Sequence, residues 1–409
     1  MPKILIIHPE GNLKNNPNLF AITRMMVDAG WEVLVYSQRR PGIYQGDIFP
    51  GAQFVFFPDS INDTIRLERS FAEEDIRFII GIDDIGIYKA KNIADFLGVR
   101  YIFLSYEIMF DHEIEKIGGR NDKKNKKRAK QATQSAVCAI VQDETRKHIL
   151  SREYCIPEEK IYLMPVSNSG SHCIEKSHYF YDKFSIPYDK KILLYMGWMD
   201  IKQEQRMIEF ARFMPSDWVL VAHSRYKYKS SIESDIVGTK LFFSFDAPVE
   251  NLDEMGALLS SCHMGFCSYE PDYTSIFTGD NIRYIGLSSG KTTTFLQYGV
   301  PVLVENMNIW NELVESKKIG LVMHQPEDLQ KLSTINPQEY ADNAIRFFDE
   351  HLDAKIYWQE IWKKVEMNAV KSRFAEFAFL QYKLHLLFET SIKSVRIYLK
   401  GVRDKYLKR

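Results

Sequence analysis

The sequence has few cysteines, and their arrangement argues against two common structural roles. The chain of 409 residues contains only five of them. They are scattered, at Cys138, Cys155, Cys173, Cys262 and Cys267. No two form a C-x-x-C pair, and an odd number cannot all be joined in disulfides. The pattern disfavours a zinc site or a disulfide framework and favours reduced thiols in a cytosolic compartment.

Long apolar runs and an excess of one charge are also missing. No stretch approaches the roughly 18 consecutive apolar residues of a membrane span, and the short apolar segment after Met1-Pro2-Lys3 is unlike a signal peptide. The formal net charge is −1, with 45% hydrophobic and 26% charged residues. This composition is typical of a globular enzyme and gives no reason to expect nucleic acid as a partner. We expect a cytosolic protein that meets a membrane, if at all, at its surface.

The chain is too long for one hydrophobic core, and its first half alternates apolar runs with amphipathic segments. Such runs are typical of buried parallel strands. The strands predicted here are Lys3–His8, Glu32–Tyr36, Gln53–Phe57, Arg77–Asp83, Val99–Ser105, Ala136–Gln142 and Lys160–Met164, with helices over Asn18–Ala29, Ile85–Leu97 and Asp143–Leu150. The alternation predicts a doubly wound, Rossmann-like α/β domain over residues 1–170.

A second alternation follows a polar stretch rich in serine and histidine, which we predict to be a linker over residues 171–189. The strands predicted after it are Lys191–Gly197, Trp218–Ala222, Lys240–Phe245, His263–Ser268 and Val302–Glu305. This pattern predicts a second Rossmann-like domain over residues 190–370. We expect helices from about residue 337 to the end, with residues 371–409 as C-terminal helices that finish in a basic amphipathic tail.

The stretch Ser288–Glu305 carries the strongest chemical signal. It predicts a loop, a short helix, a Gly-Val-Pro turn and a buried strand. The helix start combines small residues with a lysine: Ser288, Ser289, Gly290, Lys291 and Thr292. Free backbone N–H groups and the helix dipole favour an anion at such a start. We predict that it holds the diphosphate of a nucleotide-activated substrate.

The segment Gly286–Thr292 also resembles a P-loop, but it is one residue short of the G-x-x-x-x-G-K-[ST] pattern. A P-loop follows the first strand of its domain, whereas this loop comes after several strands. We therefore do not expect a nucleoside triphosphatase.

Two Rossmann-like domains in tandem with a helical C-terminus resemble the GT-B glycosyltransferases. Five stretches resemble the family's motifs in the right order. Lys3–Gly11 is similar to the first strand and acceptor-side loop, Ala136–Glu144 to "ADxVIxxSE", and Ile156–Pro165 to "VPxEKIxVIPN". Leu193–Asp200 is similar to "LLYxGxL", and Ser288–Glu305 to the variant signature "SxKLxxYLxxGxPVIV".

The resemblance implies that the second domain binds a nucleotide diphosphate sugar. The residues that it implies on the donor side are Gly197, Trp198, His223, Arg225, Ser288, Ser289, Gly290, Lys291, Thr292 and Glu305. Lys291 would supply positive charge to the leaving nucleoside diphosphate. Many retaining members carry an E-x7-E pair, but the matching positions here are Gly286 and Thr294, and of the family's basic pair only Lys202 lies near its place. Glu305 is our candidate for contact with the ribose.

An inverting transferase needs a base for the acceptor hydroxyl, expected at strand ends of the first domain. The catalytic candidates are Glu107, Asp83 and His8, with Glu107 first because it directly follows a strand. The acceptor-side candidates are Glu10, Gly11, Asn12, Tyr106, Asp111 and His112. Structural alternatives stay open: Glu107 as a helix-capping or first-turn carboxylate, Asp83 as a helix cap, and His8 as an edge histidine. Retaining chemistry would need no such base.

Two basic stretches, Arg120–Lys130 and Lys393–Arg409, fit either a solvated loop and helix or contact with anionic lipid headgroups. We therefore expect a glycosyltransferase of the hexosyl type for surface polysaccharide assembly, with a glycan or lipid-linked acceptor and possible peripheral contact with the cytoplasmic face of a membrane. No metal or other cofactor is expected, because His172 and His178 have no partner at metal-ligand spacing. The alternatives are a nucleotide-sugar epimerase of the same build and a non-catalytic nucleotide-binding subunit.

Overall fold

The computed structural model describes residues 1–9, 16–38, 51–172, 175–197, 199, 201–224, 238–245, 252–305 and 307–367. The chain forms two units. Unit 1 comprises residues 1–15, 22–163 and 359–409, and unit 2 comprises residues 16–21 and 164–358.

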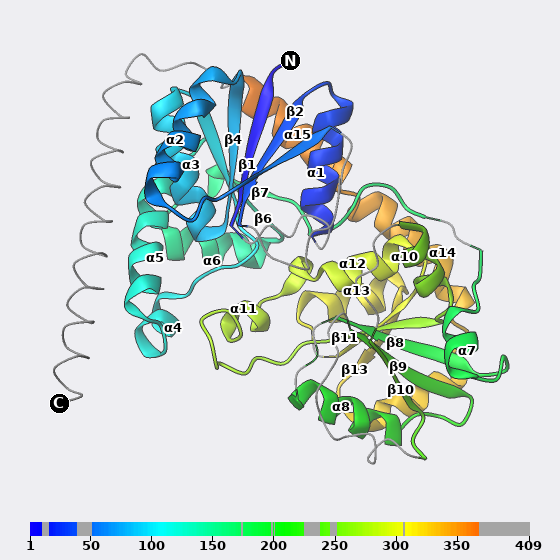
Figure 1. Cartoon of the computed structure of the whole chain (residues 1–409). Helices are drawn as coiled ribbons and strands as arrows, with labels where there is room; N and C mark the ends of the chain where they lie inside the picture. Colours follow the sequence, from blue (N-terminus) through cyan, green and yellow to red (C-terminus); the bar gives the residue numbers. More distant parts are fainter. Residues whose placement is uncertain are drawn as a thin grey trace, which may run out of the picture. The chain divides into compact units, whose positions relative to one another are not determined.

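Unit 1 is built on a parallel sheet with the strand order β3-β2-β1-β4-β5-β6-β7 (Figure 1). Its strands are β1 (Lys3–His8), β2 (Glu32–Ser37), β3 (Ala52–Phe56), β4 (Ile76–Ile82), β5 (Arg100–Leu104), β6 (Ala139–Val141) and β7 (Ile161–Leu163). Its helices are α1 (Pro17–Asp28), α2 (Ile61–Ser70), α3 (Asp83–Leu97), α4 (Asp111–Lys116), α5 (Arg120–Thr133), α6 (Glu144–Tyr154) and the end of α15 (Ala354–Met367), with short 3-10 turns η1 (Phe71–Glu73) and η2 (Glu158–Lys160).

Helices cover both faces of this sheet. The strand order runs one way from β1 to β3 and the other way from β4 to β7, so right-handed crossovers place the connections on opposite faces. Helices α2, α3 and α5 lie on one face, and α1 and α15 on the other (Figure 1). Trp362 of α15 meets the rings of Trp31 and Phe78 edge to face, at 5.5 and 5.3 Å between ring centroids. A strand covered on both faces must be apolar throughout, which explains why Ile4–Ile7 are fully buried.

Unit 2 is built on a second parallel sheet with the order β10-β9-β8-β11-β12-β13. Its strands are β8 (Lys191–Met196), β9 (Trp218–Ser224), β10 (Leu241–Phe245), β11 (Met264–Ser268), β12 (Val302–Glu305) and β13 (Gly320–Met323). Its helices are α7 (Tyr179–Phe184), α8 (Ile201–Arg212), α10 (Leu252–Ser260), α11 (Asp280–Arg283), α12 (Gly290–Gln297), α13 (Ile309–Lys317) and α14 (Gln338–His351), with 3-10 segments η3 (Gly286–Ser288) and η4 (Pro326–Thr334).

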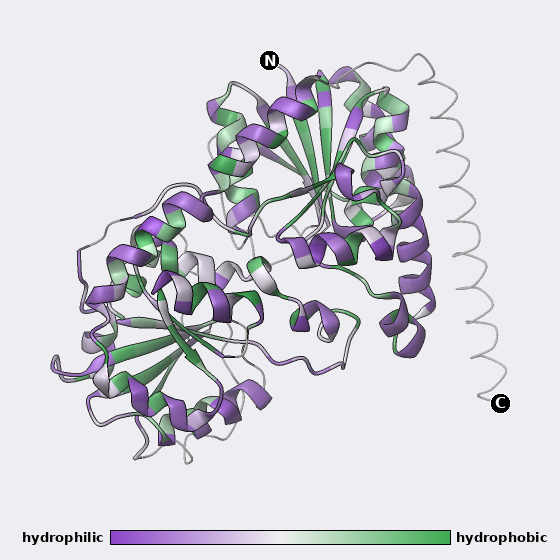
Figure 2. Cartoon of the chain, turned by 180° about the vertical axis from the view of Figure 1, so that it is seen from behind, coloured by the Kyte–Doolittle hydropathy of each residue, from purple (hydrophilic) through white to green (hydrophobic). Residues whose placement is uncertain are grey.

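Side chains of the unit 2 strands alternate between two hydrophobic clusters, one on each face of the sheet. In β8, Ile192 and Leu194 join one cluster, and Leu193 and Tyr195 join the other. The first cluster is completed by α7, α10, α12, α13 and α14, and the second by α8 and η4. Figure 2 shows the result, with hydrophobic strands inside and hydrophilic faces on the surrounding helices.

A glycine sets how closely α12 packs on this sheet. The ring of Phe295 occupies the space beside Gly265 in β11, and a Cβ atom added at Gly265 would lie 2.3 Å from that ring. Phe295 is fully buried. The missing side chain thus lets α12 lie directly on β11, and this contact fixes the position of the helix start at Gly290.

The structure confirms the predicted fold class of two Rossmann-like domains in tandem, and every predicted strand is present with shifts of a few residues at most at its ends. Strand β13 was not predicted, since Gly320–Met323 is too short a run to be distinguished from a buried helix segment. Residues 171–189 are not simply a linker, because Phe180, Tyr181 and Ile186 of the α7 region belong to the core of unit 2. The stretch Arg120–Lys130 is not a loop but part of helix α5.

Two further predictions concern the membrane and the C-terminus. Within the part of the chain that the structure describes, no helix combines the length and apolar character needed to cross a bilayer. Helices α14 and α15 agree with the predicted helical C-terminus up to residue 367. The predicted tail over 371–409, including Lys393–Arg409, lies outside the described residues.

We expect the substitution Gly265→Ala to lower the free energy of unfolding by about 1–3 kcal/mol, because the added methyl group would overlap the Phe295 ring in a filled core. Urea unfolding measures this change. The control is Gly119→Ala, where the nearest atom to an added Cβ is 3.4 Å away and the change should stay below about 1 kcal/mol. An unchanged unfolding midpoint for Gly265→Ala would contradict the tight packing, and adding Phe295→Leu should restore part of the loss.

Candidate functional site

The carboxyl ends of the unit 2 strands bring several predicted donor-side residues to one edge of the sheet. Strands β8, β9, β11 and β12 are parallel and adjacent in the sheet. Gly197 follows β8, His223 lies near the end of β9, Tyr269 follows β11, and Glu305 ends β12. Open α/β sheets bind their ligands outside this edge.

The helix α12 begins with a tight cap that uses two of the predicted hydroxyl groups. The Oγ atom of Ser289 accepts a hydrogen bond from the N–H of Thr292 at 3.3 Å, and the two hydroxyl oxygens lie 2.7 Å apart. The hydroxyl of Tyr269 lies 3.0 Å from the same Oγ atom. Ser289 and Thr292 are buried, so both hydroxyls serve the cap rather than a ligand. Ser288 lies just before it, at the end of η3.

The first amides of α12 are left available by this cap. The cap satisfies the N–H of Thr292, and the N–H of Thr293 bonds to the carbonyl oxygen of Ser289. Among the residues that the structure describes, the N–H groups of Gly290 and Lys291 have no hydrogen-bond acceptor. Two donors at the positive end of a helix dipole form a binding site for an anion.

The side chain of Lys291 adds a charge at the same point. Its Nζ atom lies 3.9 Å from the ring centroid of Tyr195 and 4.7 Å from that of Tyr269. A Cβ atom added at Gly197, where φ is +138°, would come within 3.5 Å of the Lys291 Nζ atom, so this glycine leaves room for the ammonium group. No carboxylate in the described ranges forms an ion pair with Lys291. The ammonium group is therefore held by two aromatic faces, and no residue that the structure describes gives it an anionic partner.

Burial lowers the pKa of Lys291 to about 8, and the nearby thiol of Cys267 partly opposes this shift. Removal of water disfavours the charged form of an amine unless an anion compensates. A bound phosphate group would compensate the charge and raise the pKa again. The pKa therefore agrees with the geometry in indicating an anion site.

A charged cluster beside this site contains one residue that the sequence analysis missed. The guanidinium group of Arg206, on α8, lies 2.5 Å from Oε1 of Glu305 and 3.1 Å from Oε2 of Glu270. Ser268 contacts both sides of the pair: Arg206 donates to its Oγ atom at 3.2 Å, and its hydroxyl donates to Oε2 of Glu305. The sequence signal was a second basic residue four positions after Lys202 on the same helix, but only the fold shows which way it points.

The remaining donor-side candidates have more ordinary surroundings or lie outside the described residues. His223 is buried, and its Nδ1 atom lies 2.9 Å from the Ser244 hydroxyl oxygen. Its carbonyl oxygen accepts a hydrogen bond from the N–H of Gly197 at 3.1 Å, so it helps to shape the loop after β8. Trp198 and Arg225 lie outside the described residues.

The structure also shows what occupies the two positions of the family's paired glutamates. Gly286 has φ +43°, and its carbonyl oxygen accepts a hydrogen bond from the indole N–H of Trp310 at 2.7 Å. Thr294 turns its hydroxyl back to the carbonyl oxygen of Gly290 at 2.7 Å. Neither residue offers a carboxylate; among the described residues of unit 2, Glu305 and Glu270 bring acidic groups to the carboxyl ends of β12 and β11.

In unit 1, the three catalytic candidates follow or end adjacent parallel strands. His8 ends β1, Asp83 follows β4, and Glu107 lies shortly after β5. The Oδ1 atom of Asp83 accepts hydrogen bonds from the N–H groups of Tyr106 and Glu107, at 2.7 and 2.9 Å. Asp83 is thus the first residue of α3 rather than its cap, which is Ile82. Glu107 does not cap α4 either, because Phe110 holds that position.

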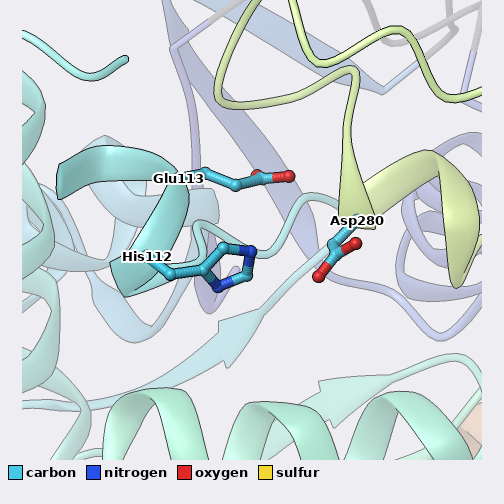
Figure 3. A group of neighbouring side chains, drawn as sticks. All are labelled: His112, Glu113 and Asp280. Atoms are coloured by element: carbon cyan, nitrogen blue, oxygen red, sulfur yellow. The ribbon is translucent and has the colours of Figure 1, made fainter. Parts of the chain in front are cut away.

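The acceptor-side candidates are spread over the loop after β5 and helix α4. Tyr106 is buried. Asp111 begins α4 and forms an ion pair with Lys130 at 2.5 Å. His112 is exposed and Glu113 is buried. Figure 3 shows both side chains extending from α4. Glu10, Gly11 and Asn12 lie outside the described residues.

No protein-family model and no curated protein sequence matches the chain, but its fold is similar to that of solved enzymes. Sucrose-phosphate synthase from Thermosynechococcus elongatus is 12% identical, with a TM-score of 0.63 over 90% of this chain and 99% of that chain. Anabaena Alr3699/HepE, solved in complex with UDP-glucose, is 12% identical, with a TM-score of 0.64 over 90% of this chain and 100% of that chain. A Listeria monocytogenes protein named as a UDP-N-acetylglucosamine 2-epimerase is 11% identical, with a TM-score of 0.57 over 90% of this chain and 97% of that chain. The chain thus has the GT-B fold.

We expect anion binding at the start of α12 to weaken above pH 8. The anion binds the charged form of Lys291, whose pKa is about 8 in the protein without a ligand. The affinity for the anion is therefore highest below pH 8 and falls by up to about tenfold per pH unit above it. Inorganic sulfate, whose charge is constant over this range, is titrated between pH 7 and 9.5 while the amide resonances of Gly290 and Lys291 are followed by NMR. Lys291→Arg is the control, because arginine stays charged. The same pH dependence in Lys291→Arg would exclude Lys291 as the titrating group.

Proposed function

We propose that this protein is a glycosyltransferase that takes a sugar from a nucleotide diphosphate sugar. The observation that carries the proposal is the half-buried Lys291 ammonium group, which has no anionic partner among the described residues and lies beside two available amides at the carboxyl edge of a parallel sheet. A diphosphate is the anion that matches both a helix start and a single point charge.

The same groups support the departure of the leaving group. When the bond between the sugar and the diphosphate breaks, negative charge grows on the diphosphate oxygen. Lys291 and the first turn of α12 are already oriented to stabilise that charge. Because Lys291 and the start of α12 would supply the positive charge, we propose that the reaction is independent of a metal ion.

The cluster around Arg206 supports a role for Glu305 in binding the ribose of the donor. Arg206 and Ser268 hold the two carboxylate oxygens of Glu305 in place. The carboxylate retains further lone pairs that can accept hydrogen bonds from the hydroxyl groups of a ribose. Glu270 is held by the same guanidinium group. It supplies a second carboxylate in the absence of the family pair at Gly286 and Thr294.

The acceptor would use unit 1, with Glu107 as the base that accepts the proton of the acceptor hydroxyl. Its side chain is exposed after β5, next to the strand ends that carry His8 and Asp83. Hexosyl transfer to a glycan or to a lipid-linked acceptor, in the assembly of a surface polysaccharide, is the form of the reaction that we propose. A nucleotide-sugar epimerase is the second candidate, because one of the similar folds carries that name.

Helix α5 supports a peripheral position on the cytoplasmic face of a membrane. Its basic residues Arg120, Lys123, Lys124 and Lys127 are exposed, whereas Lys126 is buried and unavailable. Each exposed lysine or arginine adds about 1 kcal/mol to binding of an anionic lipid surface. The protein would then work in the cytosol, at the surface where lipid-linked acceptors are found.

We expect Lys291→Ala to weaken UDP binding and to lower turnover of UDP-glucose by about 10- to 100-fold, since a hydrogen bond to a charged group contributes about 1.5–3 kcal/mol. Calorimetry measures binding, and UDP release measures turnover, with GDP and dTDP donors as parallel probes. Lys317→Ala, an exposed lysine of the same unit, is the control. Turnover should persist in EDTA.

Unchanged binding and turnover in Lys291→Ala would show that the diphosphate site is wrongly assigned. Incubation with the donor alone separates the alternatives. An epimerised sugar favours the epimerase, and release of UDP with free sugar, for which water is the acceptor, favours the transferase. Donor binding without turnover, either alone or with added glycan or lipid-linked acceptors, favours a non-catalytic subunit.

We expect the double substitution Lys123→Glu and Lys127→Glu to weaken binding to phosphatidylglycerol vesicles by at least about tenfold, because it replaces two attractive charges with repulsive ones. Sedimentation with the vesicles at physiological salt measures this. The matched control replaces two exposed lysines elsewhere, Lys317→Glu and Lys355→Glu. If wild-type protein is not retained by the vesicles, or if both double variants lose binding equally, α5 is not the membrane contact.

A further inference from the structure

The loop between β5 and α4, Ser105–Phe110, buries every side chain except one. Ser105, Tyr106, Ile108, Met109 and Phe110 are at most 8% exposed, whereas Glu107 is exposed. A connecting loop normally lies in solvent, because its backbone polar groups need partners. The buried position of this loop raises the question of what satisfies its backbone.

Charged side chains from α3 and α6 hold the first half of the loop. Asp83 accepts hydrogen bonds from the N–H groups of Tyr106 and Glu107. The buried guanidinium group of Arg146 donates to the carbonyl oxygen of Tyr106 at 2.6 Å. The peptide group between Tyr106 and Glu107 is therefore held at its N–H by Asp83 and at its carbonyl oxygen by Arg146.

A second set of ionisable groups holds the other half. Lys126 donates to the carbonyl oxygen of Met109 and lies 3.4 Å from Oε2 of Glu153, which accepts a hydrogen bond from the N–H of Asp111 at 3.0 Å. The Tyr154 hydroxyl is within 3.4 Å of the N–H of Met109 and donates to Asp84. Burial raises the pKa of that carboxyl group to about 6, although the hydrogen bond from Tyr154 and the charge of Lys126 lower it.

These groups are a costly way to hold a loop. Each buried charge loses its hydration, and replacement of buried ion pairs by apolar groups is often neutral or stabilising. Asp83 has φ +50°, a left-handed conformation that costs about 1 kcal/mol or more for a residue other than glycine. Stability alone does not explain such an arrangement. A need for one defined loop conformation does.

The electrostatics identify the side chain that this conformation serves. Burial lowers the pKa of Arg146, and the charge that opposes this most strongly is that of Glu107, ahead of Asp143 and Asp83. The Glu107 carboxylate therefore lies in the field of the same guanidinium group that holds its loop.

We propose that Asp83 and Arg146 are positioning residues that fix the Ser105–Phe110 loop so that the Glu107 carboxylate meets the hydroxyl group of the acceptor. The proposal rests on the function proposed above and changes the role of Asp83. A carboxylate that acts as a base needs a defined position, and Asp83 fixes the backbone that carries it by accepting from the N–H of Glu107 instead of binding the substrate. Arg146 fixes the same peptide group by donating to the carbonyl oxygen of Tyr106.

The experiment combines hydrogen exchange with a kinetic double-mutant cycle. In Asp83→Ala, the amides of residues 105–111 should exchange at least tenfold faster than in wild type. Turnover of UDP-glucose should show a kcat at least tenfold lower with KM for the donor unchanged, because the donor site is in unit 2. In a Glu107→Gln background, Asp83→Ala should cause no further loss of kcat, because the carboxylate whose position Asp83 fixes is already absent.

Controls separate positioning from general damage. Asp83→Asn keeps an acceptor oxygen and should retain most of the turnover, and Asp95→Ala removes an exposed carboxylate from the same helix and should change nothing. Arg146→Met removes the hydrogen bond to the carbonyl oxygen of Tyr106 and should likewise speed amide exchange in the loop and lower kcat. Wild-type exchange in Asp83→Ala, an unchanged kcat, or a full further loss in the Glu107→Gln background would each overturn the positioning role. A wild-type protein that turns over no nucleotide sugar would instead overturn the proposed function, and the role of Glu107 with it.

Discussion

The contact of the Phe295 ring with Gly265 is the constraint on which the unit 2 site depends. It lets α12 lie directly on β11, and the helix start then coincides with the carboxyl edge of the sheet. The Ser289 cap uses its own hydroxyl and that of Thr292, which leaves the first amides for a ligand. The arrangement needs a residue without a side chain in the middle of a strand, a position where glycine normally weakens a sheet.

The surroundings of Lys291 suit a proposed anion site that keeps its charge available before a ligand binds. A carboxylate partner would stabilise the ammonium group but would compete with an incoming anion. The rings of Tyr195 and Tyr269 stabilise it without that competition. The cost appears as a lowered pKa, and it is recovered when an anion binds.

The two units use polar groups in opposite ways at the carboxyl ends of their strands. At the end of the unit 2 sheet, the first amides of α12 have no acceptor among the described residues. In unit 1, buried charged groups hold the backbone of one loop at several points. The first arrangement suits a ligand that brings its own negative charge. The second suits a carboxylate such as Glu107, whose direction matters more than its local charge. A transferase needs both, one for the leaving group and one for the attacking hydroxyl.

The sequence by itself determined the architecture, because buried parallel strands must be apolar throughout and their connections amphipathic. It also predicted the helix start within Ser288–Thr292, since a capped helix start is a local feature that needs only a few neighbouring residues. The contacts of Arg206, Arg146 and Asp83 were decided by the tertiary structure alone. Arg206 contacts residues 62 and 99 positions away in the chain, and Arg146 contacts a carbonyl group 40 positions away. No local pattern encodes which distant partner a charged side chain meets, because that depends on how strands from separate parts of the chain align at one edge of a sheet.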